Sequence, residues 1–316
     1  MHKIDVSQIV AGILSYVPGL KEKLFSGGTG GSTSARYCYS VWLRHLVMAQ
    51  QHGLSTYPKA VAELGPGDSL GIGLAAMLSG ADHYYAFDVV RYSTNERNIQ
   101  IYDELVELFQ KRERIPDNGE FPEVKPYLES YDFPRWILTD KILSLALNRG
   151  RLEEIREALL NPGKKIGRML ISYIVPWQDF KVFGGVMLDM IYSQAVLEHV
   201  DDLPHTYHCL YRALKPGGYI SSQIDFRSHG TATAWNGHWA YPDIVWKLMK
   251  GSRPYLINRM PHSAHIQLIN KCGFRIVCDN KVQTASGIMR KHLSKQYKQL
   301  SDDDLITSGA FIQAVK

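Results

Sequence analysis

A short stretch in the first quarter of the chain has residue types that could hold a nucleotide. Residues 63–67 read Glu-Leu-Gly-Pro-Gly, after a short apolar run and directly before the apolar run of residues 70–81. Gly65 and Gly67 allow a tight backbone turn, and they leave no side chain between main-chain amides and a bound ligand. The pattern therefore predicts a buried strand that turns sharply into a helix at a ligand site.

An acidic residue stands where such a site needs one. Residues 83–90 form a second apolar run, and Asp88 lies near its carboxyl end, roughly twenty residues beyond the glycines. In a βαβ nucleotide site a carboxylate at this position binds the ribose hydroxyls, and it disfavours a 2′-phosphate. The two stretches together predict a ligand that contains an unphosphorylated ribose.

The rest of the chain supplies the elements that would position these residues. Apolar runs typical of strands alternate with segments of helical periodicity, which predicts a Rossmann-like α/β fold with a doubly wound, mostly parallel seven-stranded sheet. The expected strands are residues 61–64, 83–90, 169–175, 186–192, 219–226, 274–282 and 309–315. The expected helices between them are residues 35–51, 70–81, 94–114, 203–214 and 262–272.

Three regions are expected along the chain. Residues 1–57 are predicted to form N-terminal helices and a loop rich in glycine and hydroxyl groups at 26–34. Residues 58–114 and 166–316 are predicted to form the ligand-binding domain. Residues 115–165 are too long for a simple connection, and helical periodicity at 133–148 and 151–161 predicts a helical cap inserted into that domain.

Composition narrows the class of protein. The 316 residues are 45% hydrophobic and carry a formal net charge of +5, which is ordinary for a globular chain. No basic block is present, so a nucleic-acid partner is not expected. Residues 9–20 are apolar but too short to span a bilayer, and no membrane span is expected. The four cysteines have neither metal-ligand nor disulfide spacing, which predicts reduced thiols and a cytoplasmic location.

Four matches in order along the chain resemble the class I S-adenosylmethionine-dependent methyltransferases, in particular the sugar and surface-glycan methyltransferases. The first two are residues 63–67 and Asp88, although Ser69 replaces the third glycine of the fuller motif. The third is the Ser-Gln-Ala-Val-Leu-Glu-His-Val segment 193–200, which is similar to the family's turn along the methionine part of the cofactor. The fourth is the Leu-Lys-Pro-Gly-Gly turn 214–218. The resemblance covers about residues 58–283.

The resemblance implies S-adenosyl-L-methionine as the cofactor. It assigns cofactor contacts to ten residues: Glu63, Gly65, Pro66, Gly67, Asp88, Val89, Ser193, Gln194, Ala195 and Tyr37. The end of the third strand, with Trp177 or Gln178, is the expected adenine edge. For Tyr37, a buried structural role is an equal alternative.

The acceptor side follows from the chemistry of methyl transfer. An in-line displacement needs alignment of the nucleophile, and a hydroxyl acceptor also needs a base. Asp225, His229 and His199 are the candidate catalytic residues near the ends of the fourth and fifth strands. The loop 231–242, with Trp235 and Trp239, could stack on a sugar or an aromatic acceptor, or simply pack as a lid.

A small molecule or a glycan precursor is the expected acceptor, and no metal site is expected. Relatives of this kind carry a histidine near position 222 and an acid near 228, and both positions are serine here. Asp225, His229 and His238 could supply ligands, but their spacing is no recognised metal signature. An arginine at 253 or 259 could hold an anionic acceptor or bridge the lid to the sheet.

Three alternatives remain open at this point. A nicotinamide-dependent oxidoreductase would share the fold, but its fingerprint prefers a glycine where Leu70 stands. A nucleic-acid methyltransferase would carry an Asx-Pro-Pro-aromatic box where residues 193–196 read Ser-Gln-Ala-Val. A binding protein that kept the fold without catalysis is the third. The sequence names neither the acceptor nor the oligomeric state.

Overall fold

The computed structural model describes residues 6–17, 31–54, 57–177, 187–253 and 256–316. Several expectations lie outside the described residues: the start of the loop at 26–30, Gln178, and the amino-terminal residue of the fourth expected strand.

One eight-stranded sheet organises the chain, in the order β3-β4-β2-β1-β5-β6-β8-β7. The strands are β1 (Ala60–Leu64), β2 (His83–Phe87), β3 (Lys165–Ile166), β4 (Met169–Ile174), β5 (Leu188–Gln194), β6 (Leu214–Asp225), β7 (Arg275–Gln283) and β8 (Thr307–Val315). Pairs β1–β2, β1–β5, β2–β4 and β5–β6 are parallel, whereas β8 runs antiparallel to both β6 and β7. The Rossmann-like, mostly parallel sheet is confirmed.

Two details differ from the prediction. The eighth strand, β3, is a two-residue hairpin partner of β4, too short to leave a periodic pattern in the sequence. Strand β5 continues to Gln194, so residues 193 and 194 belong to the sheet and not to the turn after it. The difference matters because Ser193 was expected to face the ligand.

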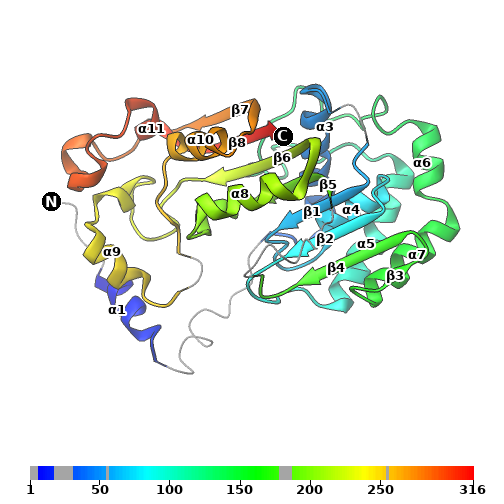
Figure 1. The fold of residues 1–316 in the computed structure, drawn as a ribbon, viewed down its shortest axis with the longest axis horizontal. Coiled ribbons are helices and arrows are strands. Elements are labelled where there is room, and N and C mark those ends of the chain that lie inside the picture. Colours follow the sequence, from blue (N-terminus) through cyan, green and yellow to red (C-terminus); the bar gives the residue numbers. More distant parts are fainter. Residues whose placement is uncertain (1–5, 18–30, 55–56, 178–186, 254–255) are drawn as a thin grey trace.

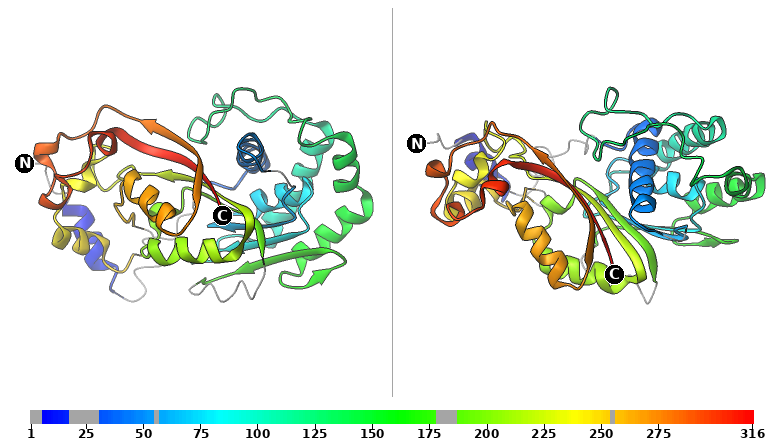
Figure 2. Two further views of the ribbon diagram at one scale, coloured as in Figure 1. Left: turned by 45° about the horizontal axis from the view of Figure 1, so that its top comes forward. Right: turned by 90° about the horizontal axis from the view of Figure 1, so that it is seen from above.

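Helices cover both faces of the sheet, as Figures 1 and 2 show. One face carries α3, α4, α5 and α7, and the other carries α8 and α10. The described helices are α1 (Val6–Leu14), α3 (Ala35–Gln51), α4 (Gly71–Leu78), α5 (Asn95–Lys111), α6 (Asp140–Ala146), α7 (Arg149–Leu160), α8 (Leu203–Ala213), α9 (Asp243–Lys250), α10 (His262–Lys271) and α11 (Asp302–Ile306). No helix in these described ranges is both long and apolar enough to cross a bilayer.

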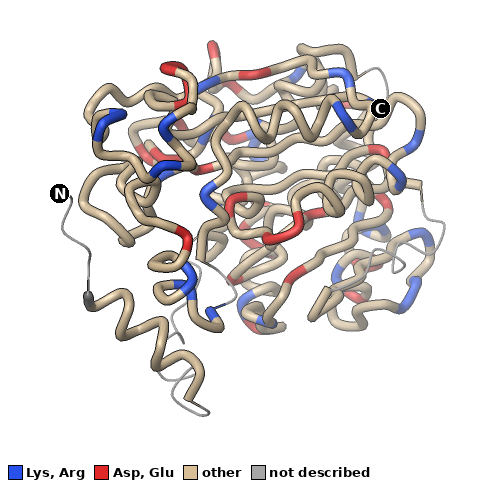
Figure 3. Tube along the Cα trace, turned by 60° about the vertical axis from the view of Figure 1, so that its left-hand side comes forward, with Lys and Arg blue, Asp and Glu red and all other residues tan. Residues whose placement is uncertain are grey.

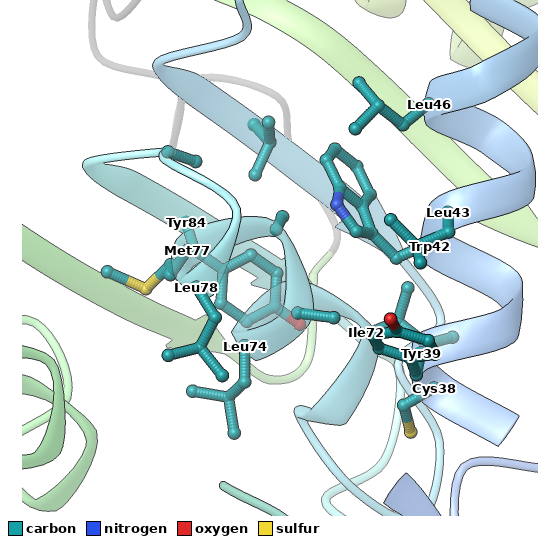
Figure 4. Close-up of a cluster of buried hydrophobic side chains, with 14 of the residues drawn as sticks. Cys38, Tyr39, Trp42, Leu43, Leu46, Ile72, Leu74, Met77, Leu78 and Tyr84 are labelled. Atoms are coloured by element: carbon teal, nitrogen blue, oxygen red, sulfur yellow. The ribbon is translucent and has the colours of Figure 1, made fainter. Parts of the chain in front are cut away.

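The core beneath the glycine stretch is packed tightly. Trp42 and Leu46 of α3 point toward α4 and Tyr84 of β2 (Figure 4). A Cβ at Gly73 of α4 would lie 2.0 Å from the ring of Tyr84, so this helix approaches the strand more closely than any larger residue permits. The helix that follows the glycine turn is therefore held in a fixed position.

The insertion divides into two parts. Its helix α7 lies beside β4 and α5, where Arg151 pairs with Asp82 over 2.7 Å, and α6 packs against α7. The coil of residues 115–139 arches round α3 instead (Figure 2). Arg44 of α3 is fully buried and donates hydrogen bonds to the carbonyl oxygens of Pro116, Val124 and Pro126 over 2.7–3.0 Å. The coil is thus fastened to the helix that precedes β1.

Charges are scattered over the chain. Lysine and arginine alternate with aspartate and glutamate along the elements visible in Figure 3. This arrangement agrees with the small net charge. All four cysteines are free thiols, and Cys38, Cys209 and Cys278 are buried.

Candidate active site

The glycine stretch forms the predicted turn between β1 and α4. Gly65 and Gly67 have φ angles of +64° and +70°, which glycine adopts without the steric cost of a Cβ. The N–H of Gly67 donates a hydrogen bond to Oδ2 of Asp88 over 3.2 Å. The acid predicted to bind ribose therefore lies directly beside the glycine turn.

The backbone of the following residue, Val89, also holds the Asp88 carboxylate. Its Oδ1 accepts a hydrogen bond from the N–H of Val89 over 2.7 Å, and the residue is 7% exposed. Burial raises the pKa of Asp88, and the hydrogen bonds from Val89 and Gly67 act against that rise. Val89 and Val90 are exposed apolar side chains next to this carboxylate, a surface that a flat heterocycle could cover.

A residue from the hydroxyl-rich loop closes the other side of the turn. Oγ of Ser32 accepts a hydrogen bond from the N–H of Ser69 over 2.9 Å and donates one to the carbonyl of Pro66 over 2.6 Å. The carboxyl end of that loop thus contacts the glycine turn. The carbonyl of Pro66 is turned to Ser32.

The turn after β5 meets the glycine turn, as the resemblance predicts. A Cβ placed on Gly65 would lie 2.5 Å from Cγ2 of Val196. Ala195 has a φ of +54°, unusual for a residue with a side chain, and its N–H donates to the carbonyl of Gln223 over 3.0 Å. The two motifs therefore share one edge of the sheet.

Two predicted cofactor residues, Glu63 and Ser193, have structural partners. Glu63 is fully buried and accepts hydrogen bonds from Tyr84 (2.5 Å) and Tyr192 (3.3 Å). Burial raises the pKa of Glu63 to about 8, although the two hydroxyl groups lower it. Ser193 is also fully buried, with its Oγ bonded to Oγ of Ser222 over 2.9 Å. Glu63 and Ser193 support the site from within the sheet.

Tyr37 and Trp177, the residue at the expected adenine edge, each contact another aromatic ring. Tyr37 contacts Phe121 of the insertion edge to face, with ring centroids 5.5 Å apart. Burial raises the pKa of Tyr37 above its ordinary value. Trp177 lies 6.0 Å from Phe87 between ring centroids, and its N–H donates to the carbonyl of Asp88 over 2.9 Å. The end of β4 therefore adjoins the ribose-binding acid.

A hydrogen-bond chain links Gln194 to the insertion. His45 of α3 bonds through Nε2 to Oε1 of Gln194 over 3.1 Å, and Gln194 donates to Oε1 of Gln223. The same oxygen of Gln223 accepts from the N–H of Lys125 over 2.6 Å, and its Nε2 donates to the carbonyl of Glu123 over 3.2 Å. The chain fixes the coil 122–127 at the carboxyl end of β6.

A cavity of about 280 Å³ lies next to the hydrogen-bonded residues Gln223 and Lys125. It lies where the coil faces the carboxyl ends of β6 and β7 and the start of β8, and its lining mixes charged and polar groups. Its lining residues include Glu123, Lys125, Gln223, Asp225, Arg227 and Thr284.

The candidate base Asp225 is paired. Arg227 donates from Nε and Nη2 to the carboxylate over 2.6–2.9 Å, and it also pairs with Glu123 over 2.9 Å. Burial alone raises the pKa of Asp225, but the hydrogen bonds and charges of Arg227 and His229 outweigh it, and the net pKa is lowered. A carboxylate with a lowered pKa is a weak base and a good orienting group.

His229 and His199 lie together. Their ring centroids are 5.0 Å apart at an interplanar angle of 89°, and Nε2 of His229 lies 3.5 Å from Oδ2 of Asp225. Burial lowers the pKa of His229; Asp225 raises it and Arg227 lowers it further. The structure thus brings together the three residues predicted to be catalytic, and it adds Glu198, whose carboxylate lies beside the two imidazoles.

The aromatic loop 231–242 mostly packs inward. Trp239 is fully buried and donates from Nε1 to the carbonyl of Arg259 over 2.9 Å. Arg259, with a φ of +65°, donates to the carbonyl of Tyr241 over 2.8 Å and pairs with Asp243 over 2.6 Å. His238 is buried against Ser228, and burial with the charge of Arg259 lowers its pKa to about 3. The loop therefore packs as a lid. Among the described residues, the Arg259 side chain donates hydrogen bonds to His238, Tyr241 and Asp243, so it ties the loop to the start of α9 and not to the sheet.

Sequence reasoning missed Ser32, His45, Gln223 and the role of Arg44. Each acts through a partner distant in the chain, and none belongs to a spaced motif. A polar residue inside an otherwise apolar element, such as His45 within α3, was the one available signal.

Comparison with known proteins agrees with this architecture. The sequence model described as "Methyltransferase domain" matches residues 57–278, which contain the glycine turn, Asp88, the turn after β5 and strand β6. No relative is found among the curated protein sequences.

Methyltransferases are among the solved structures that this chain is similar to. An S-adenosylmethionine-dependent methyltransferase from Mesorhizobium loti is 13% identical, with a TM-score of 0.40, over 88% of this chain and 98% of that one. Phosphoethanolamine N-methyltransferase 2 from Haemonchus contortus is 15% identical (TM-score 0.41, covering 87% of this chain and 52% of that one). Magnesium protoporphyrin IX methyltransferase from Synechocystis PCC 6803 is 10% identical (TM-score 0.41, covering 98% and 99%). At these identities the likeness says nothing about the acceptor.

Proposed function

The chain belongs to the methyltransferase domain family, and from this premise we propose that it transfers a methyl group from S-adenosyl-L-methionine to a hydroxyl of a small molecule or glycan precursor. One observation carries the proposal: the hydrogen bond from Gly67 to Asp88, next to the contact of Gly65 with Val196. These contacts bring a side-chain-free turn, a ribose-binding acid and the turn after β5 to one edge of a parallel sheet.

The residues at this edge fit the parts of the cofactor. Asp88 offers a carboxylate for the two ribose hydroxyls, and the exposed side chains of Val89 and Val90 adjoin it for the adenine. The left-handed glycines leave room for the amino acid part beside Ala195 and Val196. Pro66, Gln194 and Tyr37 complete the proposed contacts, while Glu63 and Ser193 hold the strands beneath them. S-adenosylmethionine supplies a methyl group already activated by its sulfonium.

The protein's task is then alignment, exclusion of water and removal of a proton. Ser193 pairs with Leu64 on one side and with Ser222 on the other, so the glycine turn and Gln223 are about two strand spacings, roughly 10 Å, apart. The cavity beside Gln223 is therefore within reach of a group held at the glycine turn. The proton of an acceptor hydroxyl is assigned to the cluster of His229, His199 and Asp225 at the same edge.

The cavity favours a small polar acceptor. Its volume of about 280 Å³ suits one sugar ring or a molecule of similar size, and ligand sites are commonly 300–1,000 Å³. Arg227, Lys125, Glu123 and Asp225 give it groups that hydrogen-bond hydroxyls. The scattered charges and the net charge of +5 support an acceptor that is not a nucleic acid. The free cysteines support a cytoplasmic location.

The direct test is methyl transfer from isotopically labelled S-adenosylmethionine to separate panels of sugars, phenols and amines. The proposal expects label in a hydroxyl-bearing acceptor, and loss of at least tenfold in rate on the change His229→Gln. The exposed His208→Gln serves as the matched control. Label found only in amines, or in nucleic acid, would reject the acceptor class while leaving the cofactor in place.

A further inference from the structure

The structure gathers three metal-ligating side chains that the sequence separates. Glu198 and His199 stand on the short 3-10 turn after β5, and His229 stands in the loop after β6. One ligand atom from each lies within 4.8 Å of the others. Glu198 is buried, His199 is half-buried and His229 is exposed, so the cluster has a carboxylate at its base and an imidazole open to solvent.

Both segments that carry the cluster are held in place. Asn258 fixes the turn: its N–H donates to the carbonyl of Glu198 over 2.6 Å, and its Nδ2 donates to the carbonyls of Leu197 and Val200 over 2.8 Å. His229 has a left-handed φ of +45°, and Thr231 N–H closes the loop onto Ser228 over 2.9 Å. Backbone strain at a side chain directed into a polar cluster is typical of functional sites.

Within the described ranges, the carboxylate of Glu198 is buried without the hydrogen bonds that normally stabilise a buried carboxylate. It is 2% exposed, and neither oxygen has a hydrogen-bond partner among the described residues. Burying a carboxylate without a hydrogen-bond partner is unfavourable, and a bound cation removes that cost.

We propose that Glu198, His199 and His229 bind one divalent transition-metal ion at the acceptor side of the site. Two imidazoles and one carboxylate suit Zn²⁺, Mn²⁺, Fe²⁺ or Co²⁺ better than Mg²⁺ or Ca²⁺, which prefer oxygen ligands. Ligand atoms bound at about 2.0–2.2 Å in a tetrahedron lie roughly 3.5 Å apart, so the side chains close in by about an ångström. Asp225, 3.5 Å from Nε2 of His229, orients that ring.

This metal site adds a catalytic group to the proposed methyl transfer. The catalytic role of the ion rests on that proposed function, whereas the binding of the ion does not. A cation at this point polarises an acceptor oxygen and makes its proton easier to lose. His229 and His199 then act as ligands, and Asp225 is the member of the cluster that is left to take the proton of the acceptor hydroxyl. The acceptor occupies an open position of the ion, as substrates do at catalytic zinc sites. Binding of the ion itself requires neither methyl donor nor acceptor.

The test is a metal titration of the full-length, tag-free protein. After treatment with EDTA, the chain is dialysed against Zn²⁺ for elemental analysis and titrated with Co²⁺ for its visible absorption. We expect one ion per chain and a cobalt spectrum of nitrogen and oxygen ligands. Glu198→Gln and His229→Asn are each expected to weaken binding at least tenfold, and asparagine tolerates the left-handed φ at 229. The exposed His208→Gln is expected to bind like the wild type.

Melting temperatures measured in EDTA show whether each variant is folded. If a variant is not folded, the cobalt spectrum of the wild-type protein decides whether nitrogen and oxygen ligands bind the ion. Binding that both folded variants retain, a spectrum dominated by thiolate ligands, or no ion bound by the wild type would each overturn the proposal. Because the titration contains no S-adenosylmethionine, its failure leaves methyl transfer untouched. Failure of methyl transfer with a normal titration would reject the proposed function and keep the metal site.

Discussion

The N–H of Gly67 lies 3.2 Å from Oδ2 of Asp88, so the glycine turn after β1 and the acid after β2 form one unit. The parallel pairing of β1 with β2 brings them together, because the carboxyl ends of neighbouring parallel strands meet at one edge. A single hydrogen bond thus ties two motifs that are 21 residues apart in the sequence.

Gly65→Ala is expected to destabilise the protein and weaken cofactor binding. The new Cβ would lie 2.5 Å from Val196, and a φ of +64° costs a side chain about 1–2 kcal/mol before any clash. Gly163→Ala is the matched control, because Gly163 has a φ of +87° and nothing within 4 Å of an added Cβ. Urea unfolding should show a larger loss for Gly65→Ala, and Val196→Ala should recover the difference. Equal losses in the two single variants would show that Val196 does not restrict the turn.

Arg44→Ala is expected to release the coil of residues 115–139. The change strips hydrogen bonds from three backbone carbonyls, and each buried group left without a partner costs about 1–3 kcal/mol. Limited proteolysis should cut the coil faster, and the free energy of unfolding should fall by about 2–4 kcal/mol. Arg36→Ala, which removes an exposed pair with Glu120, should cost less than about 1 kcal/mol. Unchanged proteolysis in Arg44→Ala would contradict the role given to this arginine.

Gln223→Leu is expected to loosen residues 122–127 while S-adenosylmethionine still binds. Lys125 donates its N–H to Gln223 over 2.6 Å, and the leucine side chain offers no acceptor. Hydrogen–deuterium exchange should therefore quicken in this segment, with the exposed Gln110→Leu as the control. Cofactor affinity should change less than twofold because Gln223 lies on the acceptor side. A slower or unchanged exchange at 122–127 would disprove the link.

The stabilising contribution of two buried histidines, His45 and His265, is expected to fall as the pH drops below about 6.5. Burial lowers the pKa of His45 to about 4, with Gln194 acting against it, and burial lowers that of His265 to about 3. The unfolded chain, with histidine pKa values near 6.5, binds these protons first, so the stabilisation present above about pH 6.5 is lost as pH falls toward the folded values.

Between pH 7 and pH 5 each of these histidines should remove on the order of 1–2 kcal/mol of unfolding free energy. Urea titrations at the two pH values measure the loss, and His265→Gln should reduce it relative to the wild type. His292→Gln, in an exposed 3-10 turn, is the control. A loss of the same size in His265→Gln and the wild type would show that His265 is not the source.

The sequence predicted the sheet and the cofactor edge because both follow from local patterns. Apolar runs of strand length and glycines with a following helix are visible within a short window, whereas the order of the strands in the sheet comes from the structure. The acceptor side was harder to predict. Trp239 and Arg259 are residue types common in ligand-binding loops, but Trp239 donates to the carbonyl of Arg259, and Arg259 donates to the carbonyl of Tyr241 and pairs with Asp243.

The metal-ligating cluster shows the same limit. Glu198 and His229 occupy different loops, and only the pairing of β5 with β6 brings these loops together. No spacing rule in one chain records that distance. Likewise, Gln223 reads as one polar residue in a strand, and its bonds to Gln194 and Lys125 depend on how the insertion folds back.

Calorimetric titration of the purified protein with S-adenosylmethionine and S-adenosylhomocysteine tests the central claim most directly. We predict binding at one site per chain, at least tenfold weaker in Asp88→Asn and unchanged in Asp103→Asn, an exposed carboxylate on α5. NAD should give no saturable heat. An absence of binding by the wild type at saturating ligand, or equal affinity in wild type and Asp88→Asn, would contradict the account.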